Sequence, residues 1–103
     1  MPLTQQRKKQ LRTVGHDLKP VVTVASKGVS AGVLGEIERA LADHELIKIK
    51  LAVEDRAERA EIATNIADQL QAEVVQSVGK TLLLLKMAKK PNPKLSNLQR
   101  YKP

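Results

Sequence analysis

The chain has 103 residues, enough for one domain with a single hydrophobic core. It contains no cysteine, phenylalanine or tryptophan. The core must therefore be aliphatic, and disulfides, thiolate metal sites and a cysteine nucleophile are excluded. No apolar run approaches the roughly 20 residues of a membrane span, and the N-terminus lacks a signal-peptide pattern, so we expect a soluble cytoplasmic protein without a membrane partner.

The net charge of +7 is distributed unevenly along the chain. The first 20 residues carry five basic side chains and one acidic one, and the last 18 carry six basic side chains and no acidic one. The middle holds seven basic and ten acidic side chains. Basic ends on a slightly acidic body favour a polyanionic partner, with nucleic acid first and an acidic membrane second. The alternative is that the charge serves only solubility.

The first predicted element is a helix over residues 4–15, with Thr4 as its N-cap and Gly15 at its C-terminal end. Four basic side chains spread around the sides of this helix that are not apolar: Arg7, Lys8, Lys9 and Arg12. The helix contains no acidic residue that could relieve their repulsion by forming ion pairs. This distribution is more lopsided than an ordinary solvated helix face requires, so we regard the four as candidate contacts for a polyanion.

A short apolar strand over residues 21–24 follows, and a turn then leads into a second helix over 30–43 with Ser30 as its N-cap. The turn contains the cation Lys27 and the flexible Gly28. Because the first N–H groups of a helix have no partners inside it and the helix dipole favours negative charge there, this stretch can hold an anion. The alternative is an ordinary strand-to-helix connection, which also favours serine and glycine.

A further strand, a helix and a hairpin of two strands complete the pattern. The expected ranges are a strand at 45–54, a helix at 56–71 that begins with a capping box at Asp55, and a hairpin of strands at 73–78 and 81–86. Lys48 and Lys50 lie on the polar side of the first of these strands, and Lys80 lies in the hairpin turn. The last strand is apolar on both faces, so we expect it to be central or covered on both sides.

This order of elements predicts an α/β fold with a four-stranded mixed sheet packed by helices. From residue 88 onward the chain is basic, contains three prolines and shows no hydrophobic period. We therefore expect one domain over residues 1–87 and an extended, flexible basic tail over 88–103.

Motifs of catalysis are missing from the residue pattern. The segment Val78-Gly-Lys-Thr resembles part of a phosphate-binding P-loop, but Val74 stands where its first glycine is required, and the segment joins two strands. His16 and His44 have no partner at the spacing of a metal site or a catalytic dyad. We expect no enzyme activity, cofactor, metal ion or small-molecule substrate.

The scarcity of aromatic residues limits how nucleic acid could be bound. Modules that stack single-stranded bases on a sheet need aromatic rings there, and Tyr101 is the sole aromatic residue of the chain. Binding would instead use phosphate contacts from lysine, arginine and main-chain N–H groups. A KH-type module binds in this way, through a short glycine loop that clamps the backbone.

Four separated motifs resemble the CRM domain (chloroplast RNA splicing and ribosome maturation), whose stand-alone bacterial form is the YhbY family. The motifs are Leu18-Lys-Pro-Val-Val, Lys27-Gly-Val-Ser-Ala-Gly-Val-Leu-Gly-Glu-Ile, Leu46-Ile-Lys-Ile-Lys and Val78-Gly-Lys-Thr-Leu. The resemblance spans roughly residues 3–87. It implies an RNA-binding α/β domain similar in fold to the C-terminal domain of bacterial translation initiation factor three, and association with precursors of the large ribosomal subunit.

The Gly-x-x-Gly loop of this family falls on Ala25-Ser26-Lys27-Gly28, so an alanine replaces the first glycine. The methyl group of Ala25 blocks the closest approach of a phosphate. We therefore expect a weaker loop clamp than the family norm, with the basic first helix compensating for it.

These observations predict a non-catalytic RNA-binding protein that acts on ribosomal RNA in large-subunit precursors. The predicted RNA-binding residues are Arg7, Lys8, Lys9, Arg12, Lys19, Ala25, Ser26, Lys27, Gly28, Ser30, Lys48, Lys50 and Lys80. The alternative is a protein-interaction module that docks on an acidic or ribosomal protein partner. The sequence leaves the oligomeric state open.

Overall fold

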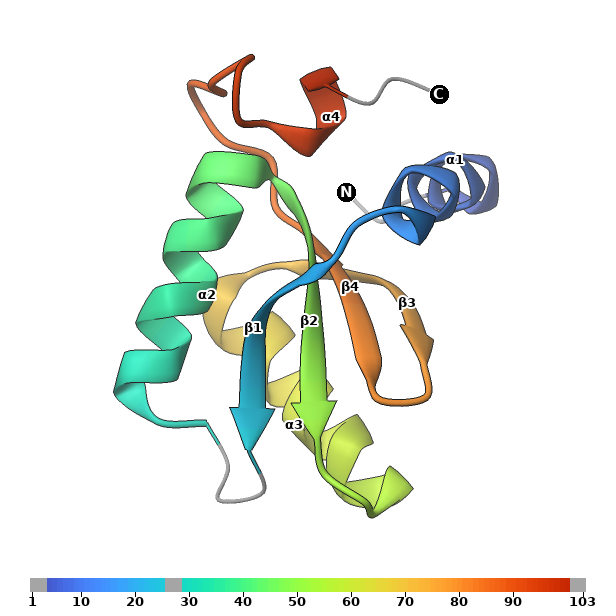
Figure 1. The fold of residues 1–103 in the computed structure, drawn as a ribbon, viewed down its shortest axis with the longest axis vertical. Helices are drawn as coiled ribbons and strands as arrows, with labels where there is room; N and C mark the ends of the chain where they lie inside the picture. The colour runs from blue at the N-terminus through green and yellow to red at the C-terminus, as the bar shows by residue number, and fades with distance from the viewer. Residues whose placement is uncertain (1–3, 26–28, 101–103) are drawn as a thin grey trace.

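The computed structural model describes residues 4–25 and 29–100. Its elements, in chain order, are α1 (Gln5–His16), β1 (Pro20–Ala25), α2 (Ala31–His44), β2 (Leu46–Ala52), α3 (Arg56–Leu70), β3 (Glu73–Val78), β4 (Thr81–Leu85) and α4 (Asn97–Arg100) (Figure 1). The predicted order is confirmed from α1 to β4, with boundaries that differ by one or two residues at most. The short helix α4 is an addition that the sequence pattern does not predict.

The strands form one mixed sheet in the order β1-β2-β4-β3. β1 pairs with β2 in parallel, whereas β4 pairs antiparallel with both β2 and β3. The predicted four-stranded mixed sheet is therefore confirmed. β4 lies inside the sheet and its four leucines are all buried, as expected for a strand that is apolar on both faces.

The two faces of the sheet are covered unequally (Figure 1). On one face, α2 and α3 pack over the larger apolar cluster, which includes Val24, Ile37, Ile49, Ile66 and Leu84. On the other face, a smaller cluster joins α1 and α4 to the sheet: Leu11, Val14, Leu46, Val75, Leu83 and Leu85, with Leu18 and Leu98 packed against it. Because α1 is short and lies toward one end, part of this second face stays open.

The predicted helix N-caps are present in the structure. The side chains of Thr4, Ser30 and Asp55 accept backbone N–H groups of their own first turns at 3.0–3.1 Å. These caps satisfy donors that no residue inside the helix can satisfy, and they explain why the three longer helices begin where they do.

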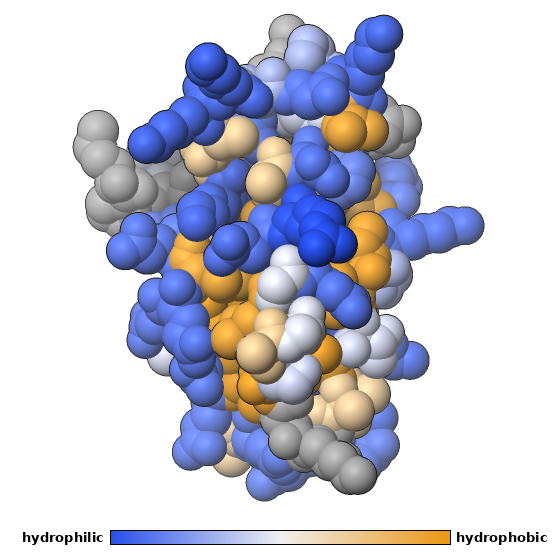
Figure 2. Space-filling model, turned by 90° about the vertical axis from the view of Figure 1, so that its left-hand side faces the viewer, coloured by the Kyte–Doolittle hydropathy of each residue, from blue (hydrophilic) through white to orange (hydrophobic). Residues whose placement is uncertain are grey.

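On the side of the molecule that Figure 2 shows, the surface is mainly hydrophilic. Figure 2 shows the side of the molecule formed by α2, where hydrophilic side chains enclose a limited apolar area. Within the part of the chain that the structure describes, no helix has the length and apolar character to cross a membrane.

Gly15 does not end α1 as predicted; the helix continues to His16 and is capped by Asp17. Gly15 is buried, and a Cβ atom at this position would lie 2.6 Å from Leu83 Cδ2. α1 approaches β4 so closely here that a Cβ atom would force the buried Leu83 side chain to shift. A helix-ending pattern and a packing glycine look alike in sequence, so the distinction needs the partner strand.

We expect Gly15→Ala to lower the free energy of unfolding by about 1–2 kcal/mol, because overpacking against buried Leu83 outweighs the better helix propensity of alanine. Gly35→Ala is the matched control. Gly35 lies in α2, and a Cβ there would meet nothing within 4 Å. This second change should stabilise the protein by up to about 1 kcal/mol. Urea unfolding measures both, and equal effects of the two substitutions would contradict the packing role of Gly15.

The C-terminal segment also differs from its predicted extended form. Over residues 88–98 it folds back onto the domain, with Ser96 and Asn97 buried and α4 beginning at Asn97. The segment is held by hydrogen bonds of individual polar side chains, and it has no hydrophobic period from which packing could be predicted. Residues 101–103 lie outside the described residues.

Candidate nucleic-acid interface

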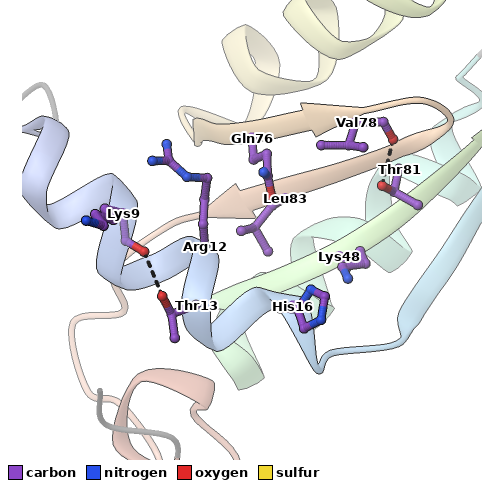
Figure 3. Close-up of a pocket in the computed structure, with 9 residues that line it drawn as sticks. All are labelled: Lys9, Arg12, Thr13, His16, Lys48, Gln76, Val78, Thr81 and Leu83. Carbon is purple, nitrogen blue, oxygen red and sulfur yellow. Dashed lines mark hydrogen bonds between the residues drawn. The ribbon is translucent and has the colours of Figure 1, made fainter.

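A groove of about 550 Å³ lies between α1 and the open part of the sheet (Figure 3). It is lined by Lys9, Arg12, Thr13, His16, Lys48, Gln76, Val78, Thr81 and Leu83. The first four come from α1 at helical spacing, so they share one side of the helix. The other five come from β2, β3 and β4, whose register brings them to the same sheet face.

The groove is positively charged. Lys9, Arg12 and Lys48 line it, and none of the described lining residues is acidic. Within the described part of the chain, neither Arg12 nor Lys48 has a carboxylate within ion-pair distance. Both are half-buried, which lowers solvent screening of their charge. An anion in this groove would therefore meet several uncompensated cations at once.

Strand register places the polar groups beside these cations. Lys48 lies opposite Leu83 of β4, which places it on the sheet face of the smaller apolar cluster, where it is half-buried and lines the groove. Gln76 also lies opposite Leu83, because a bulge between Val74 and Gln76 shifts the register of β3. Thr81 donates its hydroxyl hydrogen to Val78 O at 2.8 Å, which leaves the hydroxyl oxygen able to accept (Figure 3).

Sequence reasoning missed His16, Gln76 and Thr81 as groove residues. A signal for His16 was present, because Lys9, Arg12 and His16 follow the i, i+3, i+7 spacing of one helix side. For Gln76 no signal existed, since simple alternation along β3 would place it on the opposite face and only the bulge reverses this. Within the described residues there is no cluster of three potential metal ligands.

The other described cations that the sequence predicts as RNA contacts do not line this groove. Arg7 and Lys8 are on α1 outside the groove lining, and Arg7 Nη1 donates to Gln10 Oε1 at 3.3 Å. Lys50 is exposed on the groove face of β2, opposite Thr81. Lys19 is exposed and lines a neighbouring groove that also contains Lys48.

Lys80 is engaged in an ion pair. Its Nζ lies 2.6 Å from Glu54 Oε1, and this hydrogen bond, together with the charge of Lys80, holds the pKa of the Glu54 carboxyl below its usual value. Glu54 is almost fully exposed, so the pair contributes little to stability. The structure thus sets Lys80 apart from the groove cations, which have no such partner among the described residues.

The structure describes only the two ends of the predicted anion-binding turn. Ala25 is the exposed last residue of β1, and Ser30 caps α2 by accepting from Val33 N–H at 3.1 Å. Among the described residues, the N–H groups of Ala31 and Gly32 have no acceptor. Ser26, Lys27 and Gly28 lie outside the described residues.

The chain is similar to a known protein family and to several of its members. The family model for the CRS1/YhbY (CRM) domain matches residues 3–86. A probable RNA-binding protein of Pseudomonas aeruginosa is 48% identical over 101 residues, covering 98% of this chain and 97% of that protein. An RNA-binding protein of Haemophilus influenzae is 42% identical over 82 residues, covering 80% of this chain and 83% of that protein.

A solved structure supports the fold independently. The solution structure of a hypothetical protein from Staphylococcus aureus superposes with a TM-score of 0.77 and 24% identity, covering 86% of this chain and 93% of that one. The predicted resemblance is confirmed by the family match over most of the chain and by the identity to full-length relatives. The chain belongs to the CRS1/YhbY (CRM) domain family.

Proposed function

We propose that this is a non-catalytic, cytoplasmic RNA-binding protein that binds ribosomal RNA in precursors of the large ribosomal subunit and assists their assembly. The observation that carries the RNA part is the basic groove beside α1, in which Arg12 and Lys48 are half-buried and have no acidic partner among the described residues. The names of the Pseudomonas and Haemophilus relatives support the same partner.

The groove would bind RNA mainly by contacting the phosphates of the RNA backbone. Arg12 can donate two N–H groups to one phosphate, and Lys48 and Lys9 supply point charges. Gln76 and Thr81 carry neutral donors and acceptors that can contact a sugar hydroxyl or a base edge. Because the described residues include no phenylalanine, tyrosine or tryptophan, the sheet offers no such ring on which bases could stack.

The sheet connects this groove with the turn between β1 and α2. Lys50 lies on the groove face of β2 opposite Thr23 of β1, and Ala25 follows Thr23 on the same face. A strand of RNA that leaves the groove along Lys50 would reach the N-terminus of α2, where the N–H groups of Ala31 and Gly32 have no acceptor among the described residues. The turn and the groove would then contact one continuous backbone.

The ribosomal part of the proposal extends to this chain what the family resemblance implies. It is tested by sedimentation of cell extract containing the full-length protein through a sucrose gradient. We expect the protein in the fractions of large-subunit precursors, and expect RNase treatment to release it. A protein that stays at the top of the gradient while precursors are intact would refute the ribosomal assignment. Retention on a protein complex after complete RNA digestion would favour the protein-interaction alternative.

Restoring the first glycine of the loop should strengthen binding. We expect Ala25→Gly to raise RNA affinity a few-fold, because removal of the methyl group lets a phosphate approach the backbone more closely, at a stability cost of about 0.5–1 kcal/mol. Ala52→Gly is the matched control, since Ala52 is the exposed partner of Ala25 in the β1–β2 pair. Filter binding at fixed salt measures both. Equal affinities of Ala25→Gly and the unmodified protein would show that Ala25 does not limit the loop.

A further inference from the structure

A second groove, of about 370 Å³, continues from the first around the C-terminal end of α1. The two grooves share Lys48, which lines both. Lys19 and Asp17 line the second groove on the side of α1 and β1, and Asn97 lines it on the side of the C-terminal segment. The basic track beside α1 therefore leads directly to residues beyond β4.

The C-terminal segment is attached through a buried carboxylate. Glu45 is 1% exposed, and each of its carboxylate oxygens accepts one hydrogen bond from this segment. Oε2 accepts from Ala88 N–H at 2.6 Å, and Oε1 accepts from the Ser96 hydroxyl at 2.7 Å. A buried carboxylate is costly without such donors, so the burial of Glu45 and the docking of the segment depend on each other.

Further contacts fix the same segment from both sides. Asn97 Nδ2 donates to Leu46 O at 2.6 Å, and His44 Nδ1 lies 2.8 Å from Leu95 O, so the ring nitrogen donates to this carbonyl. Leu98 packs into the apolar cluster of α1. Glu45 itself has a φ of 60°, a strained value for a residue with a side chain, which places its carboxylate at the end of α2. Figure 1 shows the segment folding back over this end of α2 toward α1.

The docked segment displays cations in a restricted loop. Between the anchors Ala88 and Ser96 lie the exposed Lys89, Lys90 and Lys94, with no acidic residue among them. The carbonyl of Asn92 accepts N–H groups of both Leu95 and Ser96, at 3.0 and 2.7 Å, which closes a turn. Two prolines in the loop restrict it further. Because both ends of the loop are fixed by hydrogen bonds, most of the conformational entropy of these lysines is already lost in the free protein, before any ligand binds.

We infer that residues 86–98 form a second RNA-contacting surface, continuous with the α1 groove through Lys48 and held in place by Glu45. This inference rests on the proposed RNA-binding function. Except for Lys86, the surface lies beyond residues 3–86, which the family model matches. Charge decides the kind of partner. The second groove adds Lys19 to the cations of the first, and Asp17 is the one acidic residue among the described residues that line the two grooves. The C-terminal segment, which reaches the second groove through Asn97, carries the exposed Lys89, Lys90 and Lys94.

The test compares RNA binding over a range of salt concentrations, with purified large-subunit ribosomal RNA as the probe. We expect the triple change Lys89→Gln/Lys90→Gln/Lys94→Gln to lower the salt slope by at least about one unit and the affinity about tenfold at 0.1 M salt. Ser96→Ala keeps every charge but removes a donor to Glu45. This variant should also lower the salt slope and the RNA affinity, but by less than the triple change does.

A control removes two positive charges from elsewhere on the surface. Arg39→Gln/Arg56→Gln neutralises two exposed arginines of α2 and α3 and should leave the slope unchanged. Docking is read separately, by hydrogen exchange of the Ala88 amide in the free protein. We expect protection of this amide in the unmodified protein and the triple variant, and faster exchange in Ser96→Ala.

The outcomes separate this inference from the proposed function. An unchanged slope in the triple variant overturns the inference even if groove variants still weaken RNA binding. An unprotected Ala88 amide in the unmodified protein also overturns it, because the segment is then not held. An unmodified protein that binds no RNA at any salt overturns the proposed function and the inference together.

Discussion

Arg12→Gln/Lys48→Gln should weaken RNA binding about 30-fold at 0.1 M salt and lower the salt slope by about 1.5. Each phosphate contact adds about 0.7–0.9 to the slope of log affinity against log salt concentration. One contact therefore raises the affinity at 0.1 M salt roughly fivefold or more relative to the affinity at 1 M salt, and losing the contact removes this gain. These two side chains come from different elements, α1 and β2, and meet at one groove. A double change therefore removes two contacts from a single site.

Glutamine keeps the first two methylene groups of each side chain and remains polar at its tip, so the fold should remain intact. Circular dichroism and thermal unfolding verify this before binding is measured. The control is Arg39→Gln/Arg56→Gln, which removes the same charge from exposed positions on α2 and α3. If both double variants lower the slope equally, RNA responds only to net charge, and the groove has no special role.

Glu45→Ala should lower the free energy of unfolding by about 3 kcal/mol, because Ala88 N–H and the buried Ser96 hydroxyl both lose their acceptor. Glu45→Gln should cost less, since its amide oxygen can still accept one of these bonds. Urea unfolding curves measure the free energies of unfolding, which we expect to decrease from the unmodified protein to Glu45→Gln and then to Glu45→Ala. Glu36→Ala, an exposed change on α2, which Glu45 caps, should stay within about 0.5 kcal/mol.

Glu45→Gly separates the two roles of this position. Glycine adopts a φ of 60° without strain, so it recovers part of the backbone cost while losing the same hydrogen bonds as alanine. We expect Glu45→Gly to be more stable than Glu45→Ala by about 1 kcal/mol. If Glu45→Ala is no less stable than Glu36→Ala, the carboxylate does not hold the C-terminal segment.

Much of the fold could be predicted because its signals are local. The caps at Thr4, Ser30 and Asp55 depend on side chains bonding within their own first turn. The apolar character of β4 on both faces predicts its interior position, and alternation along β2 places Lys48 and Lys50 on one face. These signals need no knowledge of any distant residue.

The candidate site could be predicted only in part. Lys9, Arg12 and Lys48 were expected as separate cations, and the structure brings all three into one groove. The sequence pattern also names Lys80, but nothing local shows that Glu54, from a different loop, pairs with it. Ion pairs between distant segments depend on how the chain packs, and the spacing of residues along the sequence does not show this.

The sequence by itself determined the order of elements, the helix starts, the aliphatic core and the basic ends of the chain, since composition and periodicity act over a few residues. Only the tertiary structure decided which cations share a groove, why Gly15 has no side chain and where the C-terminal segment docks. Each of these depends on a contact between distant residues, such as Ser96 with Glu45 or Gly15 with Leu83. Such contacts follow from strand order, from register and from the bulge in β3, which no local pattern encodes.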